Sequence, residues 1–219
     1  MIPFWKHCSG QAELLILFNG WGCDETLYEK IDPGRRDFLI LSNYTQTDDV
    51  DFSFIHDYCR STVLAWSFGV YVASSLTRHR IKCTHAIAVN GTPYPVDDQY
   101  GIPESIFHGT LNSYDENSRI KFERRMIGRS RRFIPNNGQL SQRTTESQFH
   151  ELAALAKQLD KTSKPDVINH SFWSLALISD RDRIFPPGNM KRYWEEKGIP
   201  ISGDHLPDFQ MIIDRFCSG

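Results

Sequence analysis

Short apolar runs recur along the chain, and each one ends abruptly at polar residues or glycine. Runs of this length are too short for buried helices and are typical of strands that are buried on both faces. They predict strands at residues 13–18, 37–41, 61–66, 83–89 and 174–178. Because long segments separate them, we expect an α/β protein with a mostly parallel sheet and a binding site at the carboxyl ends of its strands.

The segments between the strands differ in their helical pattern. Apolar residues at roughly helical spacing predict a helix over 69–80, whereas 45–59 is acidic and aperiodic and predicts no regular helix. From 96 to 165 the pattern is helical and polar without a convincing strand, and it includes an amphipathic helix over 147–159. We therefore expect one domain over 1–219, in which 96–165 is a helical insertion that stands over the sheet.

Composition narrows the class of protein. The chain has 219 residues, 40% of them hydrophobic, which is enough for a substantial core. Its formal net charge of -2 predicts no general attraction to nucleic acid. No apolar run approaches the roughly 18 residues of a membrane span, and the first residues do not resemble an export signal. The five cysteines include no C-x-x-C pair, which argues against a zinc site or a disulfide framework. We expect a reduced, cytoplasmic monomer.

A candidate nucleophile stands where the third predicted strand ends. The strand runs into Ser67, and small residues lie two positions before it, at Ala65, and two positions after it, at Gly69. This arrangement is typical of a nucleophile elbow, in which a strand turns sharply into a helix and exposes a serine hydroxyl. By itself the pattern also fits an ordinary buried strand that ends at a serine.

A serine nucleophile needs a histidine base and an acid that orients the imidazole. Of the eight histidines, only His205 follows the last predicted strand, in a loop that contains glycine. Asp182 lies shortly after that strand and is our candidate acid, with Asp180 as the alternative. Asp180 is nearer the strand, where its side chain is expected to cap the turn. Serine, acid and then histidine is the chain order of one large class of serine hydrolases.

Such a serine also needs backbone N–H groups that face the oxyanion, each of which stabilises the transition state by about 3 kcal/mol. Phe68 follows the nucleophile and supplies one of these groups. The glycines on both sides of Trp21 allow the loop after the first predicted strand to turn its backbone inward, so that the N–H of Trp21 is the second candidate. A hairpin-like turn is the alternative interpretation of this loop.

The helical insertion carries a strongly basic segment. Residues 119–132 contain seven basic side chains and a single glutamate, although the chain as a whole is slightly acidic. This concentration indicates an anion-binding surface. A solvated helix face that is balanced by acids elsewhere is the alternative.

Five segments together resemble a known family. They are LFNGWG at 17–22, AWSFGV at 65–70, AVNGT at 88–92, FERR at 122–125 and RDRIF at 181–185. In this order, and over nearly the whole chain, they resemble the BioG-type pimeloyl-acyl carrier protein methyl ester esterases. The resemblance implies a cytosolic α/β-hydrolase with a helical lid and a reduced set of core helices. It also implies an enzyme of biotin synthesis that removes the methyl ester from pimeloyl-acyl carrier protein without a metal or another cofactor.

The resemblance gives the basic segment a partner. An acyl carrier protein presents an acidic helix and a phosphate, and clustered guanidinium groups can bind both. The candidate contacts are Arg124 and Arg125, followed by Arg119, Arg129 and Arg132. The acyl chain needs an apolar slot near the serine, and the candidates for its lining are Trp21, Phe122, Phe149 and Trp173.

Two other functions remain open. A thioesterase or acyltransferase would use the same three catalytic residues, Ser67, His205 and Asp182. A binding module without catalytic activity would instead use the basic segment to dock an acidic partner.

Overall fold

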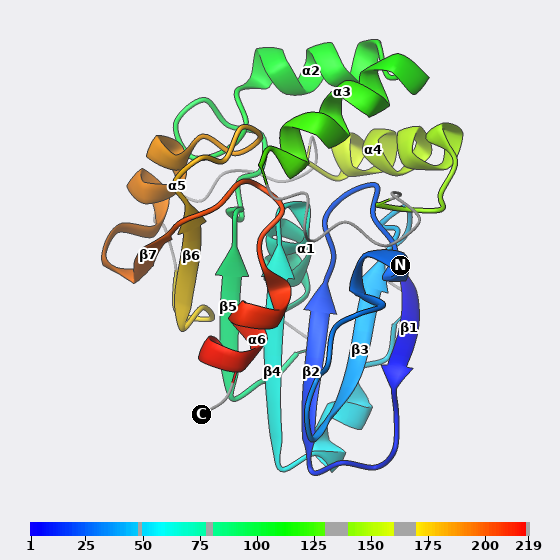
Figure 1. Cartoon of the computed structure of the whole chain (residues 1–219), viewed down its shortest axis with the longest axis vertical. Helices are drawn as coiled ribbons and strands as arrows, with labels where there is room; N and C mark the ends of the chain where they lie inside the picture. Colours follow the sequence, from blue (N-terminus) through cyan, green and yellow to red (C-terminus); the bar gives the residue numbers. More distant parts are fainter. Residues whose placement is uncertain (48–49, 78–80, 130–139, 160–169, 218–219) are drawn as a thin grey trace.

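A computed structural model describes residues 1–47, 50–77, 81–129, 140–159 and 170–217. The described part of the chain forms a seven-stranded sheet in the order β1-β3-β2-β4-β5-β6-β7 (Figure 1). Neighbouring strands are parallel except for β1, which runs antiparallel to β3. The strands are β1 (Ile2–His7), β2 (Glu13–Phe18), β3 (Arg36–Ser42), β4 (Arg60–Trp66), β5 (His85–Val89), β6 (Leu175–Ser179) and β7 (Gly198–Ile201).

The five predicted strands are confirmed as β2 to β6, whereas β1 and β7 were not predicted. Both of these are edge strands. β1 is mostly exposed, so its sequence lacks the continuous apolar pattern of a buried strand. β7 is short and contains Pro200. Edge positions tolerate proline and polar residues because one side of the strand needs no hydrogen-bond partner.

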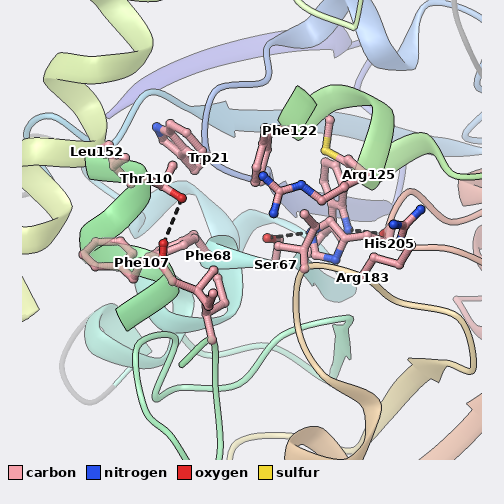
Figure 2. Close-up of a pocket in the computed structure, with 16 residues that line it drawn as sticks. Trp21, Ser67, Phe68, Phe107, Thr110, Phe122, Arg125, Leu152, Arg183 and His205 are labelled. Carbon is pink, nitrogen blue, oxygen red and sulfur yellow. Dashed lines mark hydrogen bonds between the residues drawn. The ribbon is translucent and has the colours of Figure 1, made fainter. Parts of the chain in front are cut away.

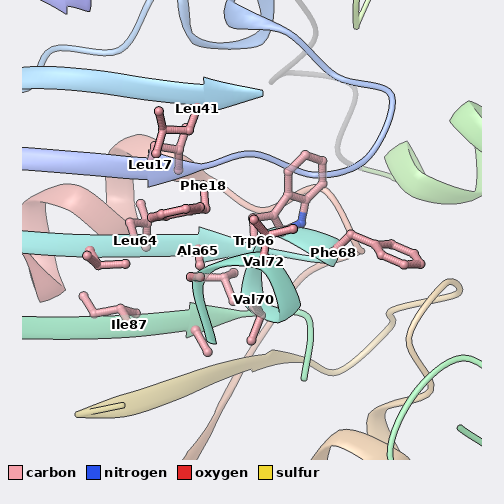
Figure 3. Close-up of a cluster of buried hydrophobic side chains, with 14 of the residues drawn as sticks. Leu17, Phe18, Leu41, Leu64, Ala65, Trp66, Phe68, Val70, Val72 and Ile87 are labelled. Carbon is pink, nitrogen blue, oxygen red and sulfur yellow. The ribbon is translucent and has the colours of Figure 1, made fainter. Parts of the chain in front are cut away.

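Helices cover both faces of this sheet. α1 (Phe68–Thr77) confirms the helix predicted after the third strand, and it lies behind the sheet in Figure 1, whereas α6 (Phe209–Phe216) lies in front of it. Buried side chains of β2, β3, β4, β5 and α1 meet in one apolar cluster (Figure 3). α5 (Pro187–Trp194) and the short 3-10 helix η4 (Glu195–Lys197) lead from β6 into β7.

The connection between β3 and β4 contains one short 3-10 helix, η2 (Ser53–Asp57), in its described residues. This confirms that the stretch predicted to lack a regular helix is thinly covered. Another 3-10 helix, η1 (Glu25–Tyr28), follows β2. The reduced helical cover leaves the core to be completed by the strands themselves and by aromatic side chains such as Tyr28 and Tyr44, both fully buried.

Three helices between β5 and β6 lie over the carboxyl ends of the strands (Figure 1). They are α2 (Glu104–Asn112), α3 (Glu116–Ile127) and α4 (Thr145–Leu159), and α4 contains the amphipathic helix predicted from the sequence. We refer to them as the lid. Among the described helices, none has both the length and the apolar character needed to cross a bilayer.

Candidate active site

Ser67 stands in a strained turn between β4 and α1. Its φ of +59° lies in the left-handed region, which is costly for a residue with a side chain. Its backbone N–H donates to the carbonyl of Val89 (2.9 Å), which fixes the turn against β5. A Cβ on Gly69 would lie 2.3 Å from the carbonyl oxygen of Phe18, so this position requires glycine. Ala65 is fully buried in the core, which accommodates its methyl group.

Three candidate side chains from different parts of the chain meet at this turn. His205 Nε2 lies 3.0 Å from Ser67 Oγ, and His205 Nδ1 lies 2.7 Å from Asp182 Oδ2 (Figure 2 shows the serine and the histidine). All three residues are buried. A carboxylate can only accept a hydrogen bond, so Nδ1–H donates to Asp182. Nε2 then carries the lone pair that can accept the proton of the serine hydroxyl.

The two candidate acids have different environments. Asp182 Oδ1 accepts hydrogen bonds from the backbone N–H groups of Ile184 (2.7 Å) and Phe185 (2.9 Å), which leaves Oδ2 for the histidine. The Asp180 carboxylate is half-exposed and accepts from the N–H of Gly203 (2.9 Å). The structure therefore brings Asp182 to His205, and Asp180 stabilises the turn, as the sequence favoured.

The backbone of the histidine is held by two residues that the sequence analysis did not single out. The carbonyl oxygen of His205 accepts from the indole N–H of Trp66 and from the Asn90 amide, both at 2.9 Å. Asn90 also accepts from the N–H of Ser179 (2.8 Å) and has a φ of +48°. The signal for its role was its place in an Asn-Gly pair at the carboxyl end of a strand. The imidazole stacks on Phe185, with the rings nearly parallel and 5.9 Å apart.

Both predicted oxyanion donors border the cavity that contains Ser67. Within the described residues, the backbone N–H groups of Trp21 and Phe68 have no hydrogen-bond acceptor. Phe68 is the first residue of α1, where the N–H has no intrahelical partner and the helix dipole favours negative charge. These two groups are thus available to an oxyanion.

The cavity above Ser67 is bordered mainly by apolar side chains, many of them from the lid (Figure 2). Its apolar lining comprises Trp21, Trp66, Phe68, Ile102, Ile106, Phe107, Phe122, Met126, Leu152 and Ile184. Among these, only Trp21 and Phe122 were predicted from the sequence to line the acyl slot, and their rings pack 4.9 Å apart.

The structure corrects the placement of the other two predicted pocket residues. Phe149 lines a separate groove together with Ala153 and Ala156, because these positions form the stripe of α4 adjacent to the buried one. Trp173 is buried in the core, where its indole N–H donates to Ser74 Oγ (3.2 Å) on α1. Neither residue borders the cavity at Ser67.

The five predicted carrier-contact arginines are in different situations. Arg125 lines the cavity, whereas Arg124 is exposed on α3 and is not part of the cavity lining. In the described part of the chain neither has a carboxylate partner. Arg119 is largely buried, pairs with Glu123 on its own helix (3.0 Å) and donates to Thr145 at the start of α4 (3.4 Å), so its guanidinium joins two helices of the lid. The side chain of Arg129 is exposed, and Arg132 lies outside the described residues.

Arg183 is a further cationic group that the sequence analysis missed. It is exposed, lines the same cavity from the loop after β6, and has no carboxylate partner among the described residues. Figure 2 shows Arg125 and Arg183 reaching the region of Ser67 and His205 from different segments of the chain. Arg183 follows the candidate acid directly, which is the sequence signal that could have identified it.

The end of α3 is hydrogen-bonded to both neighbours of the histidine. The N–H of Leu206 donates to the carbonyl of Met126 (2.9 Å), and the N–H of Arg129 donates to Asp204 Oδ2 (2.9 Å). Asp204 is buried. The loop that carries His205 is therefore joined to the lid as well as to the sheet.

The Cys23 thiol, which lies in the loop after β2, is not a competing nucleophile. Burial raises the pKa of the Cys23 thiol well above its ordinary value, and the Asp24 carboxylate raises it further, so this thiol stays protonated. Within the described ranges, no group of three or more His, Cys, Asp or Glu side chains could hold a metal ion. Ser67, whose hydroxyl lies 3.0 Å from His205 Nε2, therefore remains the candidate nucleophile.

A mostly parallel sheet, a strained serine between β4 and α1, and an acid and a histidine that follow in that order define an α/β-hydrolase. A family model described as "Pimeloyl-ACP methyl esterase BioG" matches residues 4–211. The chain belongs to this family, whose description connects it with an acyl carrier protein and with ester hydrolysis.

Individual relatives agree with this assignment. The crystal structure of BioG from Haemophilus influenzae has 34% sequence identity and a TM-score of 0.81, over 99% of this chain and 96% of that one. An uncharacterized protein of the same organism is 40% identical over 205 residues, which cover 91% of this chain and 92% of that protein. The esterase RhEst1 from Rhodococcus, with 16% identity and a TM-score of 0.62 over 99% of this chain and 92% of that one, shares the fold.

Another relative is much longer than this chain. A protein of Bacteroides fragilis named malonyl-acyl-carrier protein O-methyltransferase is 37% identical over 187 residues. The match covers 85% of this chain but only 37% of that protein. The chain thus spans little more than a third of the length of this relative.

Proposed function

We propose that this protein hydrolyses the methyl ester of pimeloyl-acyl carrier protein and releases methanol and the carrier-bound acid. The observation that carries the proposal is the hydrogen-bonded series Ser67, His205 and Asp182, placed beneath an apolar cavity. Two arginines at its border have no carboxylate partner among the described residues. Membership of the BioG family supports the choice of substrate.

The geometry supports a two-step serine mechanism. His205 Nε2 accepts the proton of Ser67 as the hydroxyl oxygen attacks the ester carbonyl, and Asp182 stabilises the imidazolium that forms. The N–H groups of Trp21 and Phe68 face the developing oxyanion. His205 then donates the proton to the departing methoxide, so that methanol leaves an acyl-enzyme. Water, activated by the same imidazole, attacks the acyl-enzyme, releases the carboxylate and restores the serine.

The surroundings of the serine suit a carrier-bound acyl chain. The apolar walls would shield the methylene groups, whereas a charged diacid end would lose its hydration there. A methyl ester is neutral and avoids this cost. The phosphate and the acidic helix of a carrier protein could bind to Arg124 and Arg125 on the lid and to Arg183 in the loop after β6.

Product analysis on the purified protein tests the proposal. Incubation with pimeloyl-acyl carrier protein methyl ester is expected to release methanol while mass spectrometry finds the acid still attached to its carrier. Ser67→Ala should abolish this turnover, and wild-type turnover by that variant would refute the mechanism. Release of the acyl group from the carrier would instead identify a thioesterase or acyltransferase.

Two further observations separate catalysis from a pure binding role. A fluorophosphonate probe should label the wild-type protein at Ser67 and leave Ser67→Ala unlabelled; a wild-type protein that resists the probe would indicate a binding module. In cells that lack their own methyl ester esterase, the wild-type gene should restore growth without biotin, and the Ser67→Ala gene should fail to do so.

A further inference from the structure

The loop that carries the candidate oxyanion donor is hydrogen-bonded to the lid. We define the oxyanion loop as residues 19–24. The indole N–H of Trp21 donates to the backbone carbonyl of Gln148 on α4 (2.8 Å). The side-chain amide of Gln148 donates to the carbonyl of Gly22 (2.8 Å), and the N–H of Gly22 donates to Glu151 Oε2 (3.1 Å). Both polar backbone groups of Gly22 are thus bound by side chains of one lid helix.

Glu151 and Gln148 are themselves held in place from other directions. Glu151 is fully buried, accepts from the N–H of Tyr44 (2.8 Å) through its other oxygen, and pairs with the guanidinium of Arg143. Gln148 accepts from the hydroxyl of Tyr114 (2.7 Å). Side chains locked on both sides in this way can position a third group accurately.

The oxyanion loop has hydrogen bonds of its own, and these mainly involve Asn19. The Asn19 side chain accepts from the N–H of Gly20 (2.8 Å) and donates to the carbonyl of Asp24 (3.2 Å). Glycines flank Trp21, and Gly22 adopts a φ of +77°, a conformation that depends on the absence of a side chain. Beyond Gly22, the Asp24 carboxylate accepts from Ser141 (2.9 Å) and Gln142 (2.8 Å), which precede α4. Asn19 thus holds the loop before Trp21, whereas the Trp21 ring and both backbone groups of Gly22 are held by α4, so the direction of the Trp21 backbone N–H depends on the lid as well as on the loop.

We propose that Gln148 and Glu151 are positioning residues that direct the backbone N–H of Trp21 toward the oxyanion, so that α4 is a fixed part of the active site. The inference rests on the serine ester chemistry proposed above, but not on the carrier-linked substrate. It assigns a catalytic consequence to a buried charged residue of the lid that does not contact the cavity.

A positioning role has a kinetic signature. A donor that binds the oxyanion acts more strongly in the transition state than in the ground state, so its displacement lowers kcat and leaves KM nearly unchanged. Complete loss of one donor lowers kcat by about 10²- to 10³-fold. A donor that is displaced but retained should lower it less, by about tenfold.

The experiment compares a small activated ester with its thionoester, in which sulfur replaces the carbonyl oxygen. Sulfur is a poorer hydrogen-bond acceptor, so the thionoester gains less from the oxyanion donors. In Gln148→Met and Glu151→Gln, which keep the size of the side chain, the ester kcat is expected to fall about tenfold. The thionoester kcat should fall less, the ester-to-thionoester ratio should contract, and KM should stay within about twofold.

Two further variants make the test specific. Gly22→Ala places a Cβ 3.4 Å from the Gln148 amide and strains the loop from its own side, so it should contract the same ratio. Leu155→Ala is the matched control: Leu155 is fully buried on the same helix and has no polar side-chain group. It should lower Tm while the ratio keeps its wild-type value.

The remaining outcomes distinguish failure of the inference from failure of the proposed substrate. If Gln148→Met and Glu151→Gln lower kcat equally for the ester and the thionoester, or lower only Tm, the two residues are structural and the inference is wrong. A wild-type protein that cleaves the small ester but not the carrier-linked methyl ester would refute the proposed substrate and leave the inference standing. A wild-type protein that cleaves neither ester would overturn both.

Discussion

Replacing Asp182 with asparagine should move the ring proton of His205 from Nδ1 to Nε2. Asp182 Oδ1 is bound by two backbone N–H donors, from Ile184 and Phe185. In Asp182→Asn the amide oxygen must therefore occupy the Oδ1 position, and the amide NH₂ must face His205 Nδ1. Nδ1 then accepts a hydrogen bond, and the ring proton moves to Nε2. That nitrogen can no longer accept the proton of Ser67.

The size of the effect follows from the cost of turning the amide around. The reversed amide would set its NH₂ against the two backbone donors and leave both of them buried and unpaired, at about 2 kcal/mol each. A total of about 4 kcal/mol corresponds to a population of about 10⁻³ for the productive orientation. Loss of the negative charge beside the imidazolium adds to this, so we expect kcat to fall by 10³- to 10⁴-fold, in line with about 10⁴-fold for this substitution in another serine triad.

Steady-state hydrolysis of a small ester at neutral pH measures this effect, and the rate of fluorophosphonate labelling provides an independent check. Asp180→Asn is the matched control, because Asp180 bonds to Gly203 and does not reach the histidine. It should keep kcat within a few-fold of wild type. The reasoning is refuted if Asp182→Asn retains a tenth or more of the activity while its Tm is unchanged, or if Asp180→Asn loses as much activity as Asp182→Asn.

Substitutions at four other places have distinct expected results. Neutralising Arg124 and Arg125 together should raise KM for the carrier-linked ester about 2- to 30-fold and flatten its salt dependence, because exposed charge pairs contribute about 0.2–1 kcal/mol each. Arg119→Ala should instead mainly lower Tm, measured by thermal unfolding, since its guanidinium pairs within α3. Gly91→Ala would place a Cβ 2.3 Å from the backbone carbonyl oxygen of Ser67. The free energy of unfolding in urea should therefore fall by about 1–3 kcal/mol, and fluorophosphonate labelling should slow. Burial alone would raise the pKa of the Asp37 carboxyl, but hydrogen bonds from backbone N–H groups and a tyrosine hydroxyl outweigh burial and lower it below 3.8. Its stabilising contribution is present above that value and lost as the pH falls through the lowered pKa, so Asp37→Asn should destabilise the protein at neutral pH and much less in strong acid.

The interior of the fold could be predicted from the sequence because burial on both faces leaves a continuous apolar run. β2, β3 and β4 are almost entirely buried, and each was visible as such a run. β1 and β7 could not be found in this way, because an edge strand is stabilised by its pairing with a neighbour rather than by its own apolar pattern.

The site was predictable where its chemistry depends on a residue type in a particular chain order. Ser67, Asp182 and His205 come together as their order suggested. The lining of the cavity was not predictable, because any apolar residue can fill either a core or a pocket. Phe149 and Trp173 were therefore assigned to the pocket on their residue type alone, and packing placed them elsewhere.

Asn90 and Glu151 show a further limit of sequence reasoning. Each acts through hydrogen bonds to segments far away in the chain, the first to residues 179 and 205 and the second to residues 22 and 44. No local pattern records such partners, and only the assembled structure brings them together.

The bonds from the end of α3 to Asp204 and Leu206 have a consequence for how this family diversifies. Arg129 and Asp204 are 75 positions apart in the chain, yet the lid and the histidine loop share one hydrogen-bonded seam. The lid contributes backbone groups to this seam, but a Cβ on Gly128 would lie 2.1 Å from Asp204 Oδ1, so an exchanged lid without this glycine would displace the histidine loop. Lineages that acquire a new lid should therefore inherit the matching histidine loop with it, and engineered chimeras should transfer the two segments together.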